Sequence, residues 1–459
     1  MYIAVFITLN MRSCIIYFAL TLLIIPQFCR AQTWSPVSSG ITGDVVNTTW
    51  SLFAYDSMLY AGGRFYMAGG TYTNDIAQWN GVSWNKVGTG TGGNVNAMAW
   101  YNGNLYAGGQ FDTMGGVIAH YIATWNGSRW DSVGKNGMKT GQHGVYCMAV
   151  YKGELYVGGQ FDTIDGSPIF GIAKWNDTSW SQLGTGIIST DEESTVSCMA
   201  VYNGDLYFGG EFVFSGGTDI AKWDGTTLST VGGGAVGTIY SLATYSGNLY
   251  AGGQLNTFGA TSANNIAMWN GKSWYALDSG ITGENGWAIV TALASYNGQL
   301  YVGGYFDTVN GQPMNCIARW NGKTWSNVST GINIGGGVDA MAVFDSALYV
   351  GGGFDSAGGV YTNNIAMWTS PSSINEISEA NGIKIYPNPA SNRVTIQLNN
   401  ITDDMRYIIY DELGQQIETG RLALSKNNSI DVSAYHTGVY MICITTASGN
   451  GCSSKFIKN

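Results

Sequence analysis

Short apolar segments alternate with glycine- and asparagine-rich turns along most of the chain. One unit reads as four strands, VNAMAWY (Val95–Tyr101), LYAGGQF, YIATW and RWDSVG, joined by tight turns such as Asn102-Gly103. Asn-Gly is a strong signal for a two-residue hairpin, because both turn positions need positive φ. The pattern therefore predicts an all-β protein built from small antiparallel sheets.

Two phrases in this unit recur along the chain. Leu-Tyr-x-Gly-Gly occurs seven times at intervals of 43 to 51 residues, and Ile-Ala-x-Trp also occurs seven times. An interval of that size is typical of a four-stranded propeller blade. The paired glycines favour close approach of neighbouring strands or sheets. We predict a seven-bladed β-propeller over residues 32–370.

The seventh repeat lacks its fourth strand. In six repeats that strand follows Ile-Ala-x-Trp and begins with Trp, or with Leu228 in one case, whereas Trp368 is followed by TSPSSINEI. The segment TWSPVSSG (Thr33–Gly40), led by Trp34, carries the missing pattern. We predict that this N-terminal strand completes the last blade and closes the ring, which pairs an edge that would otherwise be exposed. An open solenoid is the alternative, but it does not explain the complementary ends.

Most of the 16 tryptophans fall at two fixed positions of the repeat. Residues at one fixed place in every blade are predicted to pack between sheets as core. Cys147 and Cys198 share a first-strand position that elsewhere holds Ser or Ala, so we expect them to act as small hydrophobic residues.

Composition excludes some classes of partner. The chain has 459 residues with 66 glycines, 13% aromatic residues, 11% charged residues and a net charge of −10. Nucleic acid and anionic lipid surfaces are recognised by basic patches, and the sequence has no Lys/Arg cluster. The sequence also shows no metal-ligand spacing, phosphate loop or catalytic triad, so we expect no metal, no cofactor and no catalytic residues.

The connections between strands differ from one face of the predicted ring to the other. The turns on one face are uniformly tight, whereas the loops on the other vary in length and chemistry, as binding surfaces do. Within the first strand, one position near its start is the most variable and is predicted to face the channel mouth: Trp50, Asn96, Tyr146, Ser197, Tyr240, Thr291 and Asp339. The candidate ligand-binding residues are Trp287, Tyr146, Tyr240, His143, Asp191, Glu192 and Glu193. The alternative is that these loops vary because nothing constrains them.

Residues 1–31 have the features of a secretory signal peptide. Arg12 precedes the apolar run IIYFALTLLII, and CRA supplies a small-x-small cleavage site before Gln32. A membrane anchor is the alternative, but the run is shorter than the roughly 20 residues that a span needs. We therefore expect no transmembrane anchor in the mature protein. Translation can begin at Met1 or at Met11.

The C-terminal part follows a linker at residues 371–382. Residues 383–459 alternate like a small Ig-like antiparallel sandwich. Four features resemble the C-terminal sorting domain of type IX secretion cargo from Bacteroidetes: Tyr386-Pro-Asn-Pro389, Asp411-Glu-Leu-Gly414, Gly438-Val-Tyr440 and Lys455-Phe-Ile-Lys458. The resemblance implies export through the outer membrane of a Gram-negative bacterium, with release or attachment at the cell surface. Cys443 and Cys452 flank a predicted hairpin, and an exported protein permits a disulfide there.

The repeat phrases also resemble known propellers. Leu-Tyr-x-Gly-Gly-x-Phe followed by Ile-Ala-x-Trp-Asn-Gly is similar to the extracellular propeller of fungal cortical polarity-marker proteins and, more loosely, to kelch repeats. This resemblance concerns the fold, and a fold alone does not assign an activity.

Three functions remain open at this point. The sequence favours a monomeric, exported, non-catalytic binding or adhesion module with a glycan or a surface protein as partner. The alternatives are a secreted carbohydrate-active lyase or hydrolase and a purely structural surface protein.

Overall fold

The computed structural model is all-β and divides into two compact units, residues 32–369 and a C-terminal unit. It describes residues 33–43, 47–135, 137–139, 144–188, 194–283, 286–333, 335–369, 383–398, 405–410, 416–423, 425–446 and 451–459. The predicted signal peptide, the linker and the Asp411–Gly414 turn lie outside the described residues.

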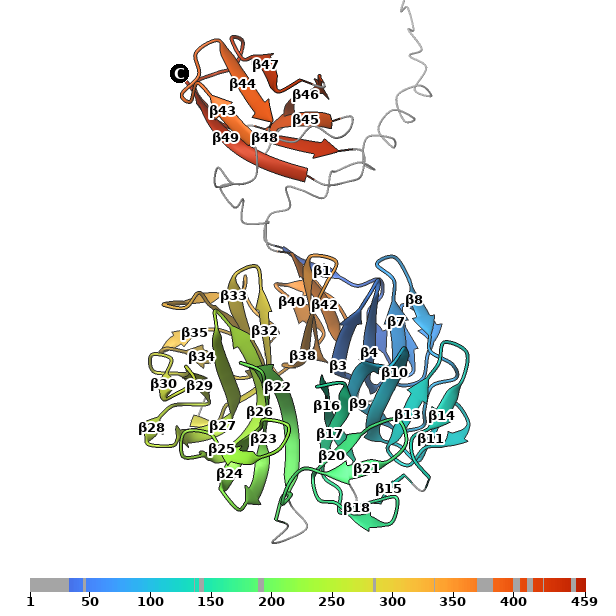
Figure 1. Ribbon diagram of the computed structural model, residues 1–459. Helices are drawn as coiled ribbons and strands as arrows, with labels where there is room; N and C mark the ends of the chain where they lie inside the picture. Colours follow the sequence, from blue (N-terminus) through green and yellow to red (C-terminus); the bar gives the residue numbers. More distant parts are fainter. Residues whose placement is uncertain are drawn as a thin grey trace, which may run out of the picture. The chain divides into compact units, whose positions relative to one another are not determined.

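The described part of residues 33–369 contains seven antiparallel sheets. In each sheet four strands lie side by side in the order first, second, third and fourth strand of the repeat (Figure 1). The first strands are β3 (Thr48–Tyr55), β9 (Asn94–Tyr101), β16 (Val145–Tyr151), β22 (Thr195–Tyr202), β26 (Ala235–Tyr245), β32 (Ile289–Tyr296) and β38 (Gly337–Phe344). The second strands are β4 (Met58–Arg64), β10 (Asn104–Gln110), β17 (Glu154–Gly159), β23 (Asp205–Phe214), β27 (Asn248–Phe258), β33 (Gln299–Tyr305) and β39 (Ala347–Gly353).

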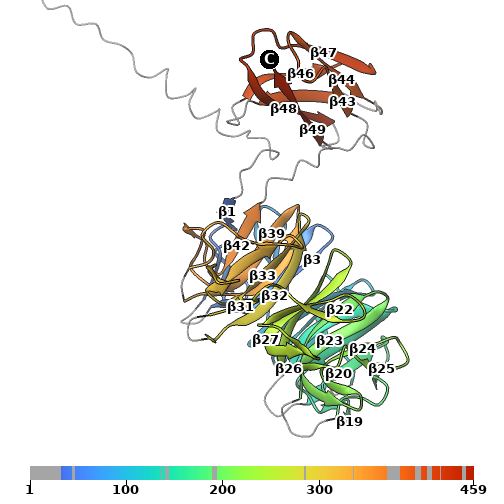
Figure 2. The same ribbon diagram turned by 90° about the vertical axis from the view of Figure 1, so that its left-hand side faces the viewer.

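The third strands carry the Ile-Ala-x-Trp phrase: β7 (Ile76–Trp79), β13 (Ile122–Trp125), β20 (Ile172–Trp175), β24 (Gly217–Trp223), β29 (Ile266–Trp269), β36 (Ile317–Trp320) and β42 (Ile365–Thr369). The fourth strands are short: β8 (Trp84–Lys86), β14 (Trp130–Ser132), β21 (Trp180–Gln182), β25 (Leu228–Thr230), β30 (Trp274–Ala276), β37 (Trp325–Asn327) and β1 (Thr33–Pro36). β1 therefore takes the fourth place in the sheet of β38, β39 and β42, with Trp34 opposite Trp368 (Figure 2).

Short strands lie in the loops between these sheets and between their second and third strands. They are β2 (Ile41–Thr42), β5 (Met67–Ala68), β6 (Thr71–Tyr72), β11 (Thr113–Met114), β12 (Val117–Ile118), β15 (Met138–Lys139), β18 (Thr163–Ile164), β19 (Ser167–Pro168), β28 (Thr261–Ser262), β31 (Ile281–Thr282), β34 (Thr308–Val309), β35 (Gln312–Pro313), β40 (Ser356–Ala357) and β41 (Val360–Tyr361).

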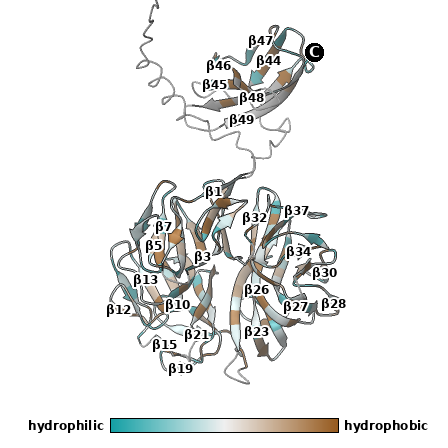
Figure 3. Cartoon of the chain, turned by 180° about the vertical axis from the view of Figure 1, so that it is seen from behind, coloured by the Kyte–Doolittle hydropathy of each residue, from teal (hydrophilic) through white to brown (hydrophobic). Residues whose placement is uncertain are grey.

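The sheets pack side by side in cyclic order. Each first strand contacts the first strand of the next sheet, and β38 contacts β3. The core lies between neighbouring sheets: one buried cluster joins Phe344, Tyr349 and Ile365 of the last sheet to Leu59 and Trp79 of the first. In Figure 3, hydrophobic residues lie along the strands of this unit and hydrophilic residues on its outer turns.

The repeated tryptophans pack in this core, as predicted. Ten of the thirteen, including Trp34 and Trp368, are buried, and Trp125, Trp180 and Trp325 are partly buried. Burying a Trp removes about 150–250 Å² from water, which stabilises by roughly 4–6 kcal/mol as an upper bound. Cys147 and Cys198 are buried free thiols, in agreement with their assignment as small apolar residues.

The C-terminal unit consists of two antiparallel sheets. One contains β43 (Ile383–Tyr386), β44 (Arg393–Leu398) and β47 (Asn427–Asp431), and the other contains β46 (Gln416–Leu422), β45 (Met405–Tyr410), β48 (Gly438–Thr446) and β49 (Gly451–Lys458). Val394 and Ile396 of the first sheet share one buried cluster with Ile442 and Phe456 of the second. The backbone register pairs Cys443 with Ser453 and Cys452 with Ile444. The two cysteines are thus not directly opposite each other, and the disulfide stays a prediction.

Candidate functional site

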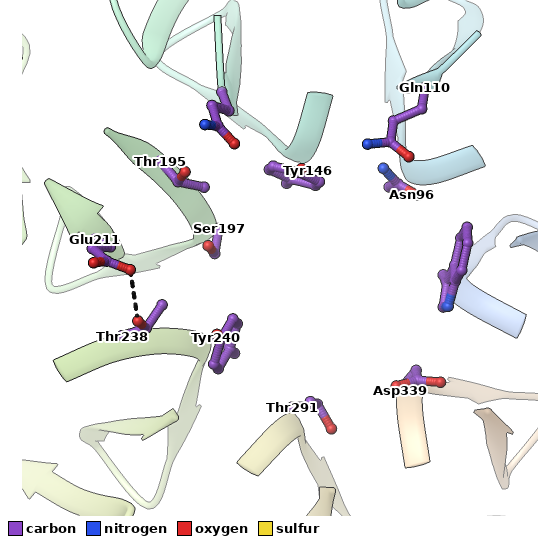
Figure 4. Close-up of a pocket in the computed structure, with 12 residues that line it drawn as sticks. Asn96, Gln110, Tyr146, Thr195, Ser197, Glu211, Thr238, Tyr240, Thr291 and Asp339 are labelled. Atoms are coloured by element: carbon purple, nitrogen blue, oxygen red, sulfur yellow. Dashed lines mark hydrogen bonds between the residues drawn. The ribbon is translucent and has the colours of Figure 1, made fainter. Parts of the chain in front are cut away.

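A cavity of about 510 Å³ lies where the first strands of the seven sheets converge. Figure 4 looks into this cavity, and its labelled side chains, which come from different sheets, surround one central space. The twelve described residues that line it are Trp50, Asn96, Gln110, Tyr146, Gln160, Thr195, Ser197, Glu211, Thr238, Tyr240, Thr291 and Asp339. Cavities of this size, with aromatic surface and a few convergent polar groups, are typical of ligand sites.

Seven of these residues occupy the same position in the seven first strands, the position that the sequence predicts at the channel mouth. In every sheet it coincides with a shift in register: Val95 pairs with Gly109 and Ala97 with Gly108, so that Asn96 has no partner in the second strand. The same shift occurs around the other six residues. Each of the seven is therefore the extra residue of a β-bulge, and bulges re-aim side chains beside functional sites.

The double glycine makes the bulge possible. A Cβ atom on Gly109 would lie 1.9 Å from the carbonyl oxygen of Asn94, which bends toward it at the bulge. A Cβ atom on Gly108 would lie 2.5 Å from Cγ1 of Val145 in the next sheet. No side chain fits at either distance, because both lie inside van der Waals contact. The repeated motif thus brings the sheets together and directs one variable residue of each into the cavity.

The lining combines aromatic rings, amides, hydroxyls and carboxylates. The amide of Asn96 donates from Nδ2 to the carbonyl oxygen of Val145 (3.2 Å), and Oγ1 of Thr238 donates to Oε2 of Glu211 (3.1 Å; Figure 4). These contacts join neighbouring sheets and hold the lining in place. Among the twelve lining residues, none is Lys, Arg or His.

Asp339 has the most perturbed environment of the lining carboxylates. Its Oδ1 accepts a hydrogen bond from the Tyr305 hydroxyl (2.9 Å), whereas its Oδ2 is buried and has no hydrogen-bond partner within the described chain. Burial raises the pKa of Asp339 to about 6, and the hydrogen bond from Tyr305 opposes this rise. Burial and the nearby Asp339 charge raise the pKa of Tyr305 in turn. A carboxyl group with a pKa near neutral changes its charge readily when a charged group binds beside it.

An apolar ring lies next to the seven bulge residues. A second space of about 240 Å³ is lined by most of the bulge residues and by the two residues that follow each of them in the first strands. The second of these two is always Leu or Met: Leu52, Met98, Met148, Met199, Leu242, Leu293 and Met341. Met and Leu side chains fill irregular gaps.

The structure brings together only part of the predicted ligand set. Tyr146 and Tyr240 line the cavity, but Trp287 is not among the lining residues. Trp287 is 54% exposed, and its ring centroid lies 6.4 Å from that of Tyr305, the hydrogen-bond partner of Asp339. The predicted residues His143, Asp191, Glu192 and Glu193 lie outside the described residues.

Five lining residues were missed by the sequence reasoning. Two of them, Thr195 and Thr238, lie two positions before the bulge residues Ser197 and Tyr240 of their strands. Gln110, Gln160 and Glu211 directly follow the double glycine of their repeats. A signal existed, since the residue after the double glycine is Arg, Gln, Glu, Tyr or Gly in different repeats while the two glycines do not change. It was overlooked because the phrase was interpreted as a purely structural motif.

No group of three or more His, Cys, Asp or Glu side chains that could hold a metal ion occurs among the described residues. Over the same residues, no helix has the length and apolar character needed to cross a membrane.

Solved structures that match this chain in part include two extracellular domains from B. thetaiotaomicron. One belongs to a protein described as a one-component system, with 10% identity, a TM-score of 0.47, and coverage of 94% of this chain and 58% of the other. The second belongs to a hybrid two-component system, with 11% identity, a TM-score of 0.46, and coverage of 93% and 58%. The chain thus spans less than two thirds of these proteins. YjhT has 12% identity, a TM-score of 0.34, and coverage of 78% and 99%.

No curated protein matches the sequence of this chain. Residues 384–459 match the family described as the secretion system C-terminal sorting domain. This match agrees with the resemblance found in the Tyr386-Pro-Asn-Pro389 and Lys455-Phe-Ile-Lys458 motifs. A sorting domain of this type implies interaction with the type IX secretion machinery and export to the cell surface or the medium. Residues 384–459 are thus the type IX secretion sorting domain of an exported protein.

Proposed function

We propose that residues 32–370 form a seven-bladed β-propeller closed by β1, and that its cavity is the ligand site of a non-catalytic binding or adhesion module. The observation that carries the proposal is the ring of bulge residues. Seven equivalent positions on one repeated scaffold hold seven residues of six different types, and all of them line one cavity.

The variation at this position contrasts with its neighbours along the strand. The residue before it is Val, Ile or Thr, the residue after it is Ala, Ser or Cys, and the next is Leu or Met. The neighbours are uniform because they pack within and between sheets. A variable polar and aromatic ring on a uniform frame is how a repeat protein supports recognition.

The chemistry of the lining favours a carbohydrate. Trp50, Tyr146 and Tyr240 offer flat apolar rings on which the C–H face of a sugar can stack, and each ring buries a large area. Asn96 and Gln110 offer amide groups that donate to and accept from hydroxyls. A glycan of the cell surface or surroundings is therefore the preferred ligand, ahead of a surface protein.

One observation favours an enzyme as the second candidate. Asp339, with its raised pKa, and the Tyr305 hydroxyl form a pair suited to proton transfer in a lyase or hydrolase. Release of reducing ends or unsaturated products from a bound polysaccharide would support this alternative. Binding without turnover would support the recognition module.

The test is binding of the mature protein to a glycan array, followed by calorimetry with any glycan that binds. Tyr240→Ala should weaken binding at least tenfold, because it removes a stacking surface of the cavity. Tyr275→Ala is the matched control, since Tyr275 is 48% exposed on β30 and is not a lining residue. Trp287→Ala tests whether the exposed ring beside Tyr305 also contacts the ligand. Absence of binding by the wild type to glycans and to isolated surface proteins would refute the proposal.

A further inference from the structure

The charged side chains that line the cavity are all acidic. Asp339 and Glu211 are its ionisable acids, and the twelve lining residues include no basic side chain. The ion pairs found in the described chain, Arg129–Asp131, Lys174–Glu154 and Lys222–Asp205, all involve other carboxylates. Among the described residues, neither lining acid therefore forms an ion pair.

We propose that the cavity selects a saccharide that carries a free, protonated amino group. The proposal rests on the proposed glycan-binding function and specifies its ligand. It excludes uronic acids, sialic acids and phosphorylated or sulfated sugars, because an anion would face two carboxylates with no basic side chain among the twelve described lining residues to offset them.

Asp339, which lines the cavity, is the recognition residue. Its Oδ1 is occupied by the Tyr305 hydroxyl, and its buried Oδ2 has no partner within the described chain. A buried carboxylate without a full set of donors is costly, so a cationic ligand in the cavity that offsets the Asp339 charge gains part of that cost. An ammonium group donates hydrogen bonds and also brings the compensating charge, which a sugar hydroxyl does not.

The aromatic residues add a second attraction for a cation. Trp50 lies on β3, which contacts the β38 strand of Asp339, and Trp is the best ring for a cation–π contact. In Figure 4, Tyr240, Thr291 and Asp339 follow one another around the cavity. A ligand amine beside Asp339 thus lies in a cavity that also carries the aromatic rings of Trp50, Tyr146 and Tyr240.

The test compares a glucosamine tetramer with its fully N-acetylated counterpart by calorimetry on the mature protein at pH 7. The two probes differ in amine charge, and we expect the glucosamine tetramer to bind at least tenfold more tightly. The preference should shrink in 1 M salt, because a charge contributes to it. Asp339→Asn should abolish the preference while keeping the acceptor for Tyr305, and circular dichroism verifies its fold. The control Asp131→Asn, at an exposed carboxylate outside the cavity, should retain the preference.

The outcomes separate the two proposals. Equal or tighter binding of the acetylated tetramer, or an unchanged preference in Asp339→Asn, would overturn the amine selection and leave a neutral-glycan site standing. Binding of neither tetramer, with neutral glycans still bound on the array, would likewise overturn only the amine selection. Absence of binding to every glycan tested would refute glycan recognition together with the amine selection.

Discussion

Trp34 packs against Trp368 with ring centroids 5.0 Å apart and planes at 50°. The Trp pairs that join third and fourth strands within a repeat have the same geometry: Trp79–Trp84, Trp125–Trp130, Trp175–Trp180, Trp269–Trp274 and Trp320–Trp325 are 5.0–5.4 Å apart at 42–49°. Trp34 also donates from Nε1 to the carbonyl oxygen of Val328 in the neighbouring sheet, as Trp84 does to Val37. β1 therefore makes the contacts of an ordinary fourth strand.

This equivalence predicts the cost of removing Trp34. Trp34→Ala should lower the free energy of unfolding by about 3–5 kcal/mol, the usual cost of deleting a buried Trp. Trp84→Ala, at the same position of the next repeat, is the matched comparison. Thermal melting of the two variants should give similar losses. A much smaller loss for Trp34→Ala would mean that β1 frays and contributes little.

The double glycine gives a second prediction. Gly109→Ala should destabilise the fold by about 1–3 kcal/mol, because its Cβ would lie 1.9 Å from the Asn94 carbonyl oxygen and the bulge at Asn96 would have to move. Gly92→Ala is the control, since a Cβ there meets no atom within 4 Å and the backbone needs no positive φ. Equal melting temperatures for the two variants would show that the bulge does not depend on glycine.

Asp75 is predicted to make stability depend on pH. Its Oδ1 accepts from the backbone N–H of Phe65 (2.8 Å), and burial raises its pKa to about 6. An acid whose pKa is higher in the folded state binds more protons there, so its contribution favours folding at low pH and is lost as pH rises from about 4 to 6. A difference of two pKa units corresponds to about 3 kcal/mol.

Asp75→Asn should therefore raise the melting temperature at pH 7.5, and its advantage should shrink at pH 5. Asn265, the equivalent residue of the fifth repeat, accepts from Leu255 N–H and donates to the carbonyl oxygen of Ile281. The reverse change Asn265→Asp is the control and should be destabilising at pH 7.5 but less so at pH 5. A pH-independent difference between Asp75→Asn and wild type would contradict the prediction.

Removal of the sorting domain should abolish export without affecting the folding of residues 32–369. Deletion of residues 384–459 should leave the protein inside the outer membrane of a bacterium that has the type IX machinery, because the sorting signal is lost. Residues 32–369 form a compact unit of their own, so the retained product should keep the melting temperature of that unit. Fractionation with immunoblotting measures location, and secretion of the truncated chain would contradict the assignment.

The sequence predicted the frame because its repeats are nearly uniform. Leu-Tyr-x-Gly-Gly and Ile-Ala-x-Trp located the second and third strands, since core packing imposes the same residues in every repeat. The seventh repeat lacks a fourth strand after Trp368, and the segment led by Trp34 has the pattern of that strand. This indicated that the two segments pair.

The site was only partly predictable. Variation at one first-strand position pointed to Tyr146 and Tyr240, because a position that does not pack is free to differ between repeats. Trp287 was grouped with them by loop membership, but the direction of a side chain in a long loop depends on backbone dihedrals that composition does not fix. The bulges were not anticipated, because the contact of Gly109 with the Asn94 carbonyl arises only once the strands are paired.

Cross-linking β1 to β42 tests the central claim most directly, because the cavity exists only if the seven sheets form a closed ring. Thr33 pairs with Thr369, and their Oγ1 atoms lie 3.3 Å apart. In a Thr33→Cys/Thr369→Cys variant, mild oxidation should give an intramolecular disulfide, detected by peptide mass spectrometry, and a higher melting temperature, since the bond closes a very long loop. Cysteines that stay reduced, or that link only between molecules, would contradict closure by β1.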